Sequence, residues 1–537
     1  MAEKKTNYLR GAALLAATVA ITKVIGAIYK IPLYNLLGDE GTAHFQVTYT
    51  IYNLLLTLST AGIPVALSRL IAAALATNRP LQVKRYFSVG LSAFVVIGGV
   101  CMAIMLLLPQ QLADLMGDPD VAMGVRALAP AVLFACAISV YRGYAQGHAN
   151  MMPTAISQIM EVSCKLVFGI AIAWLLSAAG HDKATISAGA IIGVTIGLAL
   201  AVPILMFYKV RMDRKKSAPT GAPDVPMSRR ATLAQIMKIG IPIMLGSSIM
   251  NIITLIDTKL VLLRLESGAG LLHDAAITLY GVYSKGLTMF ALPSAFIVPV
   301  TVSVVPAISA ALARRQGAEA REVMESSLKL TNLLAMPAAV GLSVLSAPVF
   351  QLLFPDSDPH GPSLLAVLAI ASFFVCSQLI TNAILQASGH ERLALLSLPI
   401  GGVIKIAVNW FLVGTPTWNI MGAPVGTLAC YVCITALNVL FILWKVPEPP
   451  NFLKISLRPA VCTACMGAAA WGVYGLAARF AGNLLHGRFG QLLILVGVIV
   501  LAVLIYAVLA ILLRAVTRED MKLVPKGEKI AKILKIK

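Results

Sequence analysis

The sequence predicts an all-α polytopic membrane protein with about fourteen transmembrane helices. Of its 537 residues, 58% are hydrophobic and only 12% are charged. The mean hydropathy of +0.85 lies far outside the range of soluble globular domains. The apolar residues occur in runs that are long enough to cross about 30 Å of hydrocarbon as helices. These observations exclude a soluble protein.

Fourteen apolar runs, bounded by polar or Gly/Pro-rich connections, define the expected spans. They cover residues 10–36, 44–76, 84–109, 121–148, 153–178, 184–209, 232–263, 276–312, 321–354, 363–388, 392–414, 419–445, 455–480 and 489–514. Several of these runs exceed the length that a bilayer requires. We therefore expect tilted or kinked helices.

The connections between the spans alternate in charge. The basic ones contain Arg79/Lys84/Arg85, Arg142, the run 209–230, Arg314/Arg315/Arg321, Arg392 and Lys445/Lys454. The acidic ones contain Asp39/Glu40, Asp114/Asp118/Asp120, His181/Asp182, Glu266/Asp274 and Asp356/Asp358. Basic connections stay in the cytoplasm, so both termini are expected there. This distribution explains the net charge of +20 without nucleic acid.

Two halves of the chain resemble each other. The segment from Gln146 to Lys165 matches the segment from Gln386 to Lys405, with the same spacing of 19 residues and an offset of 240. An even number of spans separates the copies, so the repeat is parallel. The expected parts are an N-lobe at 1–209, a cytoplasmic linker at 210–231, a C-lobe at 232–445, two added helices at 446–514 and a basic cytoplasmic tail at 515–537. Each lobe has six helices.

The tail has two interpretations. Ile530, Ile533 and Leu534 share one helical side, while lysines occupy much of the rest. This pattern favours a helix that lies on anionic membrane lipids. A solvated basic tail fits it equally well.

Charged side chains within the spans are the candidate binding residues, because an ammonium in hydrocarbon is costly unless it faces a wet cavity. The cations outnumber the acids, which predicts a site for anions. The candidates for binding an anionic headgroup are Lys23, Arg69, Lys285 and Lys405, with Lys30 as either a further ligand or an interfacial anchor. Arg69 follows a Gly-Ile-Pro break and is near enough to the cytoplasmic end to snorkel.

Two acids lie within the spans. Glu161 precedes Lys165 by four residues, which predicts a structural ion pair on one helix. Lys405 is the repeat mate of Lys165 and has Gly401 where that partner would be. Asp257 is close in sequence to Lys259 and Arg264, so we expect a structural role.

Motifs for bond chemistry are not found in the sequence. It has no phosphate-binding Gly-rich loop, no His-Glu-x-x-His and no nucleophile elbow. Cys430-x-x-Cys433 and Cys462-x-x-Cys465 imitate a zinc signature but lie in apolar spans without His. Gly189, Gly193 and Gly197 form a stripe for close helix packing. We expect a transporter rather than an enzyme, with no cofactor and no metal.

Four short motifs resemble a known family. They are Thr-Lys-Val-Ile-Gly at 22–26, Gly-Ile-Pro-x-Ala-x-Ser-Arg-Leu at 62–70, Tyr-Ser-Lys-Gly-Leu at 283–287 and Val-Pro-Ala-Ile-Ser at 305–309. Together with the two Gln-containing turns, they resemble the polysaccharide-transporter branch of the multidrug/oligosaccharidyl-lipid/polysaccharide (MOP) exporter superfamily. Within it, the stage V sporulation protein B group, related to lipid II flippases, is the best match.

The resemblance implies a V-shaped two-lobe fold in a bacterial cytoplasmic membrane, with alternating access and a cationic cavity. The implied cargo is a polyprenyl-pyrophosphate-linked saccharide, first of all the peptidoglycan precursor lipid II. Lys23 matches a cation on the first helix of such flippases. Their second cation, six residues later, corresponds to Tyr29 here, with Lys30 beside it.

Two alternatives stay open at the level of the sequence. A multidrug or cation antiporter of the same superfamily would couple transport to ions through Glu161 and Asp257. A membrane scaffold of an envelope-synthesis complex would use the linker and the tail to bind cell-wall synthesis proteins. The sequence does not identify the glycan, the driving ion or potential, the oligomeric state, or a vegetative as against a sporulation role.

Overall fold

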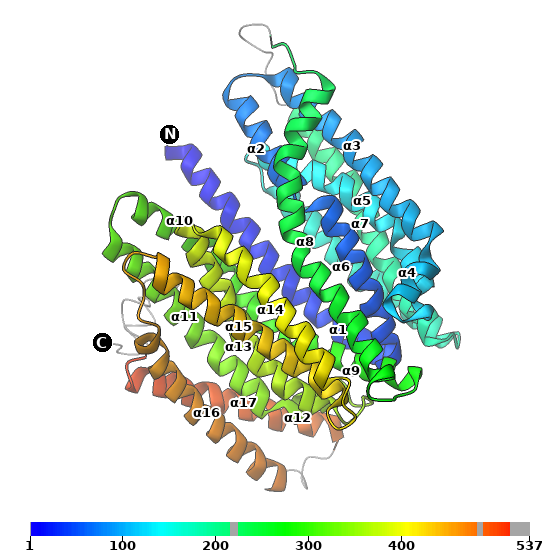
Figure 1. Ribbon diagram of the computed structural model, residues 1–537, viewed down its shortest axis with the longest axis vertical. Coiled ribbons are helices and arrows are strands. Elements are labelled where there is room, and N and C mark those ends of the chain that lie inside the picture. The colour runs from blue at the N-terminus through cyan, green and yellow to red at the C-terminus, as the bar shows by residue number, and fades with distance from the viewer. Residues whose placement is uncertain (1, 215–223, 481–486, 516–537) are drawn as a thin grey trace. The chain divides into compact units, whose positions relative to one another are not determined.

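The computed structural model describes residues 2–214, 224–480 and 487–515, and within these ranges it contains helices and no strand (Figure 1). The expected tail at 515–537 lies outside the described residues, apart from Ala515. The chain forms two compact units. Unit 1 comprises residues 1–266 and 271–281, and unit 2 comprises residues 267–270 and 282–537.

The helices of the first half run through unit 1, and the last of them continues into unit 2. They are α1 (Ala2–Thr60), α2 (Ile63–Ala76), α3 (Pro80–Leu107), α4 (Pro109–Met116), η1 (Pro119–Val121), α5 (Ala122–Gly147), α6 (Met152–Ala178), α7 (Lys183–Arg214), α8 (Arg229–Ser267) and α9 (His273–Phe290).

The remaining helices belong to unit 2. They are α10 (Leu292–Ala313), α11 (Gly317–Val344), α12 (Ser346–Leu353), α13 (Gly361–Ala387), α14 (Glu391–Leu412), η2 (Asn419–Met421), α15 (Gly422–Lys445), α16 (Phe452–Phe480) and α17 (Gly487–Leu512).

Thirteen helical segments of the described chain are long and apolar enough to cross a membrane. The first of them, Ile21–Ala76, has 56 residues. At about 1.5 Å per residue it is more than twice as long as the ~30 Å hydrocarbon core is thick, so it accommodates the first two expected spans. This multi-pass helical architecture confirms the predicted fold class.

Two backbone breaks shape the long first segment. Gly38 lies inside α1 with φ 73° and ψ −167°, a conformation that a residue with a Cβ rarely adopts. The second break separates α1 from α2 at Gly62, just before Pro64, as the Gly-Ile-Pro motif predicts. A Cβ at Gly62 would overlap the backbone of Gly240 in α8, so this glycine also permits close packing.

The parallel repeat predicted from the sequence appears in the order and length of the helices. In unit 1, α3 has 28 residues and α4 has 8. In unit 2, α11 likewise has 28 residues and α12 has 8. In each unit three further long helices follow this pair, α5 to α7 and α13 to α15. The expected lobe boundary at 210–231 falls inside unit 1, and the six-helix division stays a prediction.

In unit 1, basic connections gather at one end of the helices. Arg79 Nε donates to Asp224 Oδ1 at 3.2 Å, which joins the α2–α3 turn to the segment before α8. Tyr144 near the end of α5 contacts Asp213 near the end of α7 at 2.5 Å. The basic connections of this unit therefore lie together at one end of its helices, as the alternation of charge along the sequence predicts.

The acidic connections of unit 1 meet at the opposite helix ends. Lys259 Nζ donates to the carbonyl of Asp114 at 3.4 Å, joining α8 to α4. A Cβ at Gly41 would lie 3.4 Å from the carbonyl of Lys183, which places the kink of α1 beside the start of α7. The side of the membrane on which each end lies stays a prediction.

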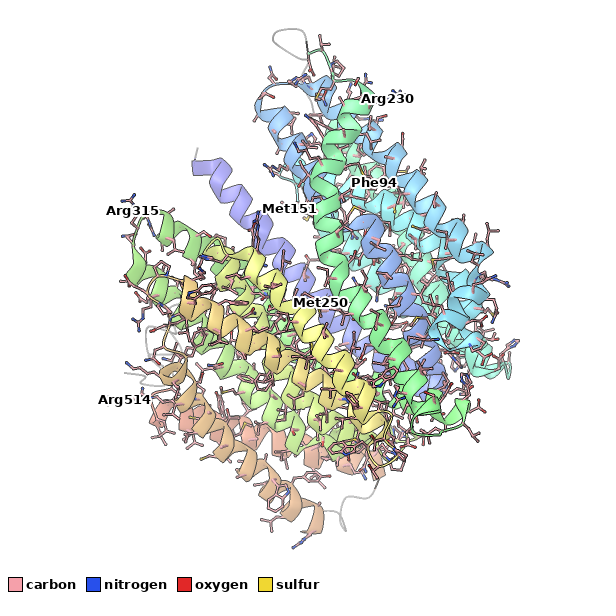
Figure 2. The ribbon with its side chains drawn as sticks, viewed as in Figure 1. Phe94, Met151, Arg230, Met250, Arg315 and Arg514 are labelled. Atoms are coloured by element: carbon pink, nitrogen blue, oxygen red, sulfur yellow. The ribbon has the colours of Figure 1, made fainter. Side chains whose placement is uncertain are left out.

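In unit 2, exposed arginines lie at a connection and at a helix end beside which the sequence predicts basic segments. Figure 2 shows Arg315 beyond α10 and Arg514 beyond α17, each at the edge of its helices. Arg514 also accepts a hydrogen bond at its carbonyl from Arg458 of α16, at 3.1 Å. Strong hydration of guanidinium groups keeps such residues at the polar ends of apolar helices.

Candidate functional site

The best-defined group of charges inside unit 1 surrounds Lys165 on α6. Its ammonium lies 4.5 Å from the ring centroid of Tyr49 and 5.3 Å from that of Tyr29, and both tyrosines belong to α1. The aromatic rings stabilise the ammonium through their negative faces. α1 packs against α6 over this region, so two distant parts of the sequence form one site.

Lys30 is the second ammonium of this group. It is half-buried and lies 5.7 Å from the centroid of Tyr34, one turn further along α1. Lys30 and Lys165 are close enough to repel each other electrostatically. Two like charges at an apolar helix interface create a local preference for an anion. We call Lys30, Lys165, Tyr29, Tyr34 and Tyr49 the lysine–tyrosine cluster.

The cluster also contains two hydroxyl groups with unmet hydrogen-bonding capacity. The hydroxyl oxygens of Tyr29 and Tyr34 are buried and have no hydrogen-bond partner within the described residues. A buried hydroxyl without a partner costs free energy comparable to a lost hydrogen bond. These groups can donate to an anion or to water that enters the cluster.

Glu161 does not pair with Lys165 as expected from their spacing. Its Oε2 instead accepts a hydrogen bond from Arg142 Nη2 of α5 at 3.1 Å, and Arg142 Nε donates to Ser157 Oγ at 2.9 Å. The Arg142 guanidinium can donate hydrogen bonds to two acceptors at once. The Lys165 ammonium, one turn from Glu161 on the same helix, can approach the carboxylate from fewer directions. Within the described residues, Lys165 therefore has no carboxylate in hydrogen-bond contact.

Lys23 and Arg69 lie away from this cluster. Lys23 is exposed on α1, seven residues before Lys30, which corresponds to about 10 Å along the helix. A Cβ at Gly26 would meet no atom within 4 Å, so the helix face beside Lys23 is open. Arg69 is exposed on α2. Both cations are accessible, as an anion ligand requires.

The two candidates of unit 2 differ from each other. Lys285 on α9 is only 2% exposed, and its ammonium lies 5.3 Å from the ring centroid of Phe354. Lys405 on α14 is half-buried. Lys285 is therefore enclosed, while Lys405 keeps part of its surface exposed. Asp257 on α8 in unit 1 is buried, at 5% exposure.

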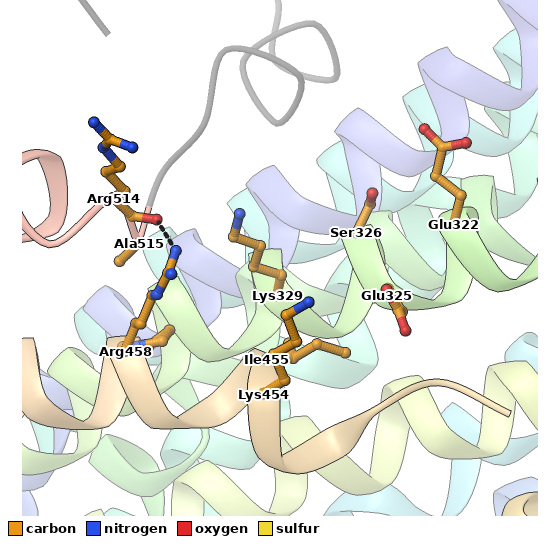
Figure 3. A pocket seen from close by; sticks show the side chains of 10 residues that line it. Glu322, Glu325, Ser326, Lys329, Lys454, Ile455, Arg458, Arg514 and Ala515 are labelled. Carbon is orange, nitrogen blue, oxygen red and sulfur yellow. Dashed lines mark hydrogen bonds between the residues drawn. The ribbon is translucent and has the colours of Figure 1, made fainter. Parts of the chain in front are cut away.

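A separate pocket of about 260 Å³ lies at the end of α11 and α16 in unit 2 (Figure 3). Its charged lining consists of two carboxylates, Glu322 and Glu325, and four cations, Lys329, Lys454, Arg458 and Arg514. The carboxylates offset only part of the positive charge. Unlike the lysine–tyrosine cluster, this pocket therefore contains its own acidic partners for some of its cations.

The sequence could not identify Arg142 and the tyrosines as parts of this site. Arg142 was assigned to a basic connection because it is close to the end of α5, but its side chain reaches back to Glu161. The signal that was present is the density of aromatic residues between Tyr29 and Tyr52. Tyr49 stacks on Phe45, with ring centroids 4.9 Å apart.

Curated relatives match over nearly the whole chain. The uncharacterized membrane protein YabM of Bacillus subtilis is 28% identical over 530 residues, which are 98% of this chain and 96% of the relative. Stage V sporulation protein B of the same organism is 24% identical and covers 97% of this chain and 98% of its own length. Lipid II flippase MurJ, also of B. subtilis, is 24% identical over 75% of this chain and 77% of its own length.

Solved structures share the fold. The lipid II flippase MurJ in an inward closed conformation superimposes with a TM-score of 0.69 at 14% identity, over 93% of this chain and 99% of that one. A multidrug resistance MATE family transporter of the MOP superfamily, in an inward-facing conformation, gives 0.63 at 15% identity, over 83% and 98%. At these identities the comparisons establish the fold alone.

The family model described as polysaccharide biosynthesis protein matches residues 8–312, more than half of the chain. This segment contains the lysine–tyrosine cluster, Lys23, Arg69 and Lys285. The chain belongs to the polysaccharide biosynthesis protein family, in the polysaccharide-transporter branch of the MOP superfamily.

Proposed function

We propose that the protein is a flippase that moves a polyprenyl-pyrophosphate-linked saccharide across the cytoplasmic membrane by alternating access. The peptidoglycan precursor lipid II is the first candidate cargo. The observation that carries the proposal is the lysine–tyrosine cluster, with two half-buried ammonium groups among tyrosine rings and the nearby Glu161 paired with Arg142. Such a group suits a pyrophosphate, whose oxygens accept several charge-assisted hydrogen bonds.

The names of two relatives support this choice of cargo. One is a lipid II flippase, and the other is a sporulation protein of similar length to this chain. An amphiphilic cargo also suits a protein that has cations among its apolar membrane helices. A headgroup binds among cations, while its polyprenyl tail stays in the bilayer. Because the ligand shifts conformations only through differential affinity, the cations have to bind more strongly in one state than in the other.

The proposed headgroup ligands are Lys23, Arg69, Lys285 and Lys405, with Lys30 as a further ligand. The structure adds a reason to include Lys165, because its ammonium has no carboxylate in direct contact. The accessible Lys23 and Lys405 are the proposed first contacts. Lys285 is enclosed, so its proposed role requires a conformation that exposes it.

Lys23→Ala and Lys405→Ala are expected to abolish translocation while leaving the protein folded and inserted. Each removes a cation that contacts the headgroup, and neither side chain supports the buried core. The measurement is translocation of lipid II by purified protein in proteoliposomes, repeated with other lipid-linked saccharides to identify the cargo. Normal translocation by both variants would show that the cationic-site mechanism is wrong.

A multidrug or cation antiporter is the rival within the superfamily. It would require acids that bind a proton or a cation, yet Glu161 is paired with Arg142. Glu161→Gln and Asp257→Asn are therefore expected to leave drug efflux from intact cells at the level of the parent protein. Efflux that is present in the parent and lost in either variant would favour the antiporter over the flippase.

A further inference from the structure

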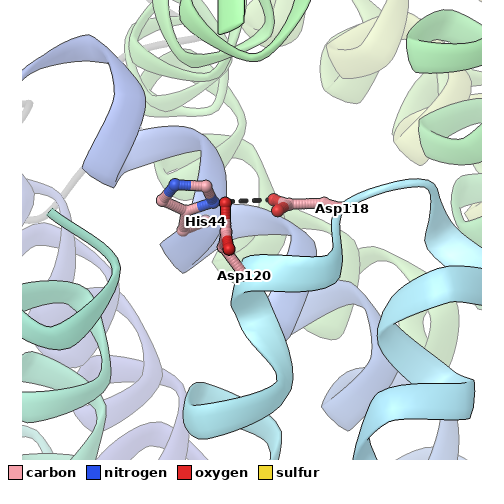
Figure 4. Close-up of side chains that lie close together, drawn as sticks. All are labelled: His44, Asp118 and Asp120. Atoms are coloured by element: carbon pink, nitrogen blue, oxygen red, sulfur yellow. Dashed lines mark hydrogen bonds and ion pairs between the residues drawn. The ribbon is translucent and has the colours of Figure 1, made fainter. Parts of the chain in front are cut away.

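Three side chains that could bind a metal converge in unit 1, at the end with the acidic connections. His44 lies on α1, six residues after the kink at Gly38, and Asp118 and Asp120 lie at the η1 turn before α5 (Figure 4). Each residue offers one ligand atom, and these atoms all lie within 4.8 Å of one another. Sequence spacing does not predict this group, because His44 and Asp118 are 74 positions apart.

The two central residues of the group are buried and incompletely satisfied. His44 Nδ1 and Asp118 Oδ2 are 2.8 Å apart, and the side chains are 3% and 0% exposed. The other carboxylate oxygen, Asp118 Oδ1, and the other ring nitrogen, His44 Nε2, have no hydrogen-bond partner within the described residues. A buried carboxylate oxygen without a donor is costly, so the site requires something that the protein itself does not supply.

The charge around the imidazole is strongly negative. Glu40 Oε1 lies 3.7 Å from His44 Nε2, and Asp120 lies beside Asp118. Within the described residues, neither Asp118 nor Asp120 pairs with a lysine or an arginine. Three carboxylates surround one imidazole, and even a protonated imidazole would leave a net negative charge. A divalent cation would neutralise it.

We propose that His44, Asp118 and Asp120 bind a divalent first-row transition metal, with Zn²⁺ bound more tightly than Mn²⁺. Imidazole and carboxylate ligands suit these ions, whereas an imidazole disfavours Mg²⁺ and Ca²⁺, and the Irving–Williams order places Zn²⁺ above Mn²⁺. Ligands about 2.1 Å from a tetrahedral metal lie about 3.4 Å from one another, which is within the 4.8 Å that encloses the ligand atoms of these three residues.

A metal at this site would connect two helices of unit 1. It would join α1, just beyond its kink, to the turn that begins α5. A ligand that binds only the folded state raises its stability in proportion to the logarithm of ligand concentration over Kd. The proposed metal therefore stabilises the bend of α1, and the inference does not depend on which cargo the protein carries.

The test is isothermal titration of the purified full-length protein with ZnCl2, followed by MnCl2, with MgCl2 for comparison. The parent protein is expected to bind one equivalent of Zn²⁺ and to melt at a higher temperature with it. Asp120→Asn, at an exposed residue that the fold does not need, is expected to weaken Zn²⁺ binding at least tenfold. His44→Gln and Asp118→Asn are expected to abolish it.

His360→Gln is the matched control. His360 Nδ1 contacts Asp358 Oδ1 at 2.6 Å in unit 2, but His360 is exposed, and no third His, Cys, Asp or Glu in the described part of the chain joins the pair in a metal-binding group. The control is expected to bind Zn²⁺ as the parent does. The proposal is overturned if the parent binds no Zn²⁺, if Asp120→Asn binds it unchanged, or if His360→Gln loses it as well.

Discussion

Lys165→Met is expected to reduce translocation of the lipid-linked saccharide by roughly 10- to 150-fold. The reason is the loss of a charge-assisted hydrogen bond to a phosphate, worth about 1.5–3 kcal/mol. Methionine keeps the length and the apolar contacts of the lysine stem, so the packing of α6 against α1 is retained. Lys165→Arg keeps the charge and is expected to preserve most of the activity.

Lys209→Met provides the matched control for this experiment. Lys209 is also a lysine over an aromatic ring, with its ammonium 5.0 Å from the centroid of Phe87, but it pairs with Asp213 at 2.8 Å. Its charge is already used within the protein, so normal translocation is expected. If both variants translocate equally, the lysine–tyrosine cluster is not part of the route.

Rates at several concentrations of the lipid-linked saccharide separate two roles for Lys165. If Lys165 binds the headgroup, its loss is expected to raise the substrate concentration that gives the half-maximal rate. A residue that only positions α6 would lower the maximal rate without that shift. Lys23→Ala measured in the same series shows whether the accessible cation and the cluster act on the same step.

The long-range organisation of this chain was predictable because it follows from hydropathy. A helix in a membrane satisfies its own backbone, so an apolar run and its flanking charges are enough to locate it. The break before α2 was predictable as well, since Gly62 and Pro64 disfavour a continuous helix. The break at Gly38 falls in the connection expected between the spans 10–36 and 44–76, but hydropathy did not show that the helix resumes at once, with a kink in place of a loop.

The candidate site was only partly predictable, for a different physical reason. Sequence spacing describes one helix, and it correctly placed Glu161 near Lys165. The partner that Glu161 takes comes from α5, through Arg142, and the rings beside Lys165 come from α1. Contacts between helices depend on their rotation and on their distance. Neither quantity can be read from the hydropathy of a single span.

Close packing of α6 against α7 sets the distance between these two helices. A Cβ at Gly193 of α7 would stand 2.5 Å from the Cα of Gly169 in α6, and one at Gly197 would stand 2.8 Å from the carbonyl oxygen of Glu161. The predicted glycine stripe is thus confirmed as the α6–α7 contact. Real Cβ atoms do not approach a backbone this closely, so a side chain there forces the helices apart.

Gly193→Val is therefore expected to destabilise the protein by about 1–3 kcal/mol, since the overlap is with backbone that cannot rotate away. The measurement is the melting temperature and the monodisperse fraction in detergent. Gly99→Val on α3, where a Cβ meets no atom within 4 Å, is the control and should melt like the parent. Equal behaviour of the two variants would mean that α6 and α7 are not packed this closely. The smaller substitution Gly193→Ala is expected to lower translocation while the protein stays folded. The reason is that a shift of α6 also displaces Glu161 and Lys165, which both lie on this helix.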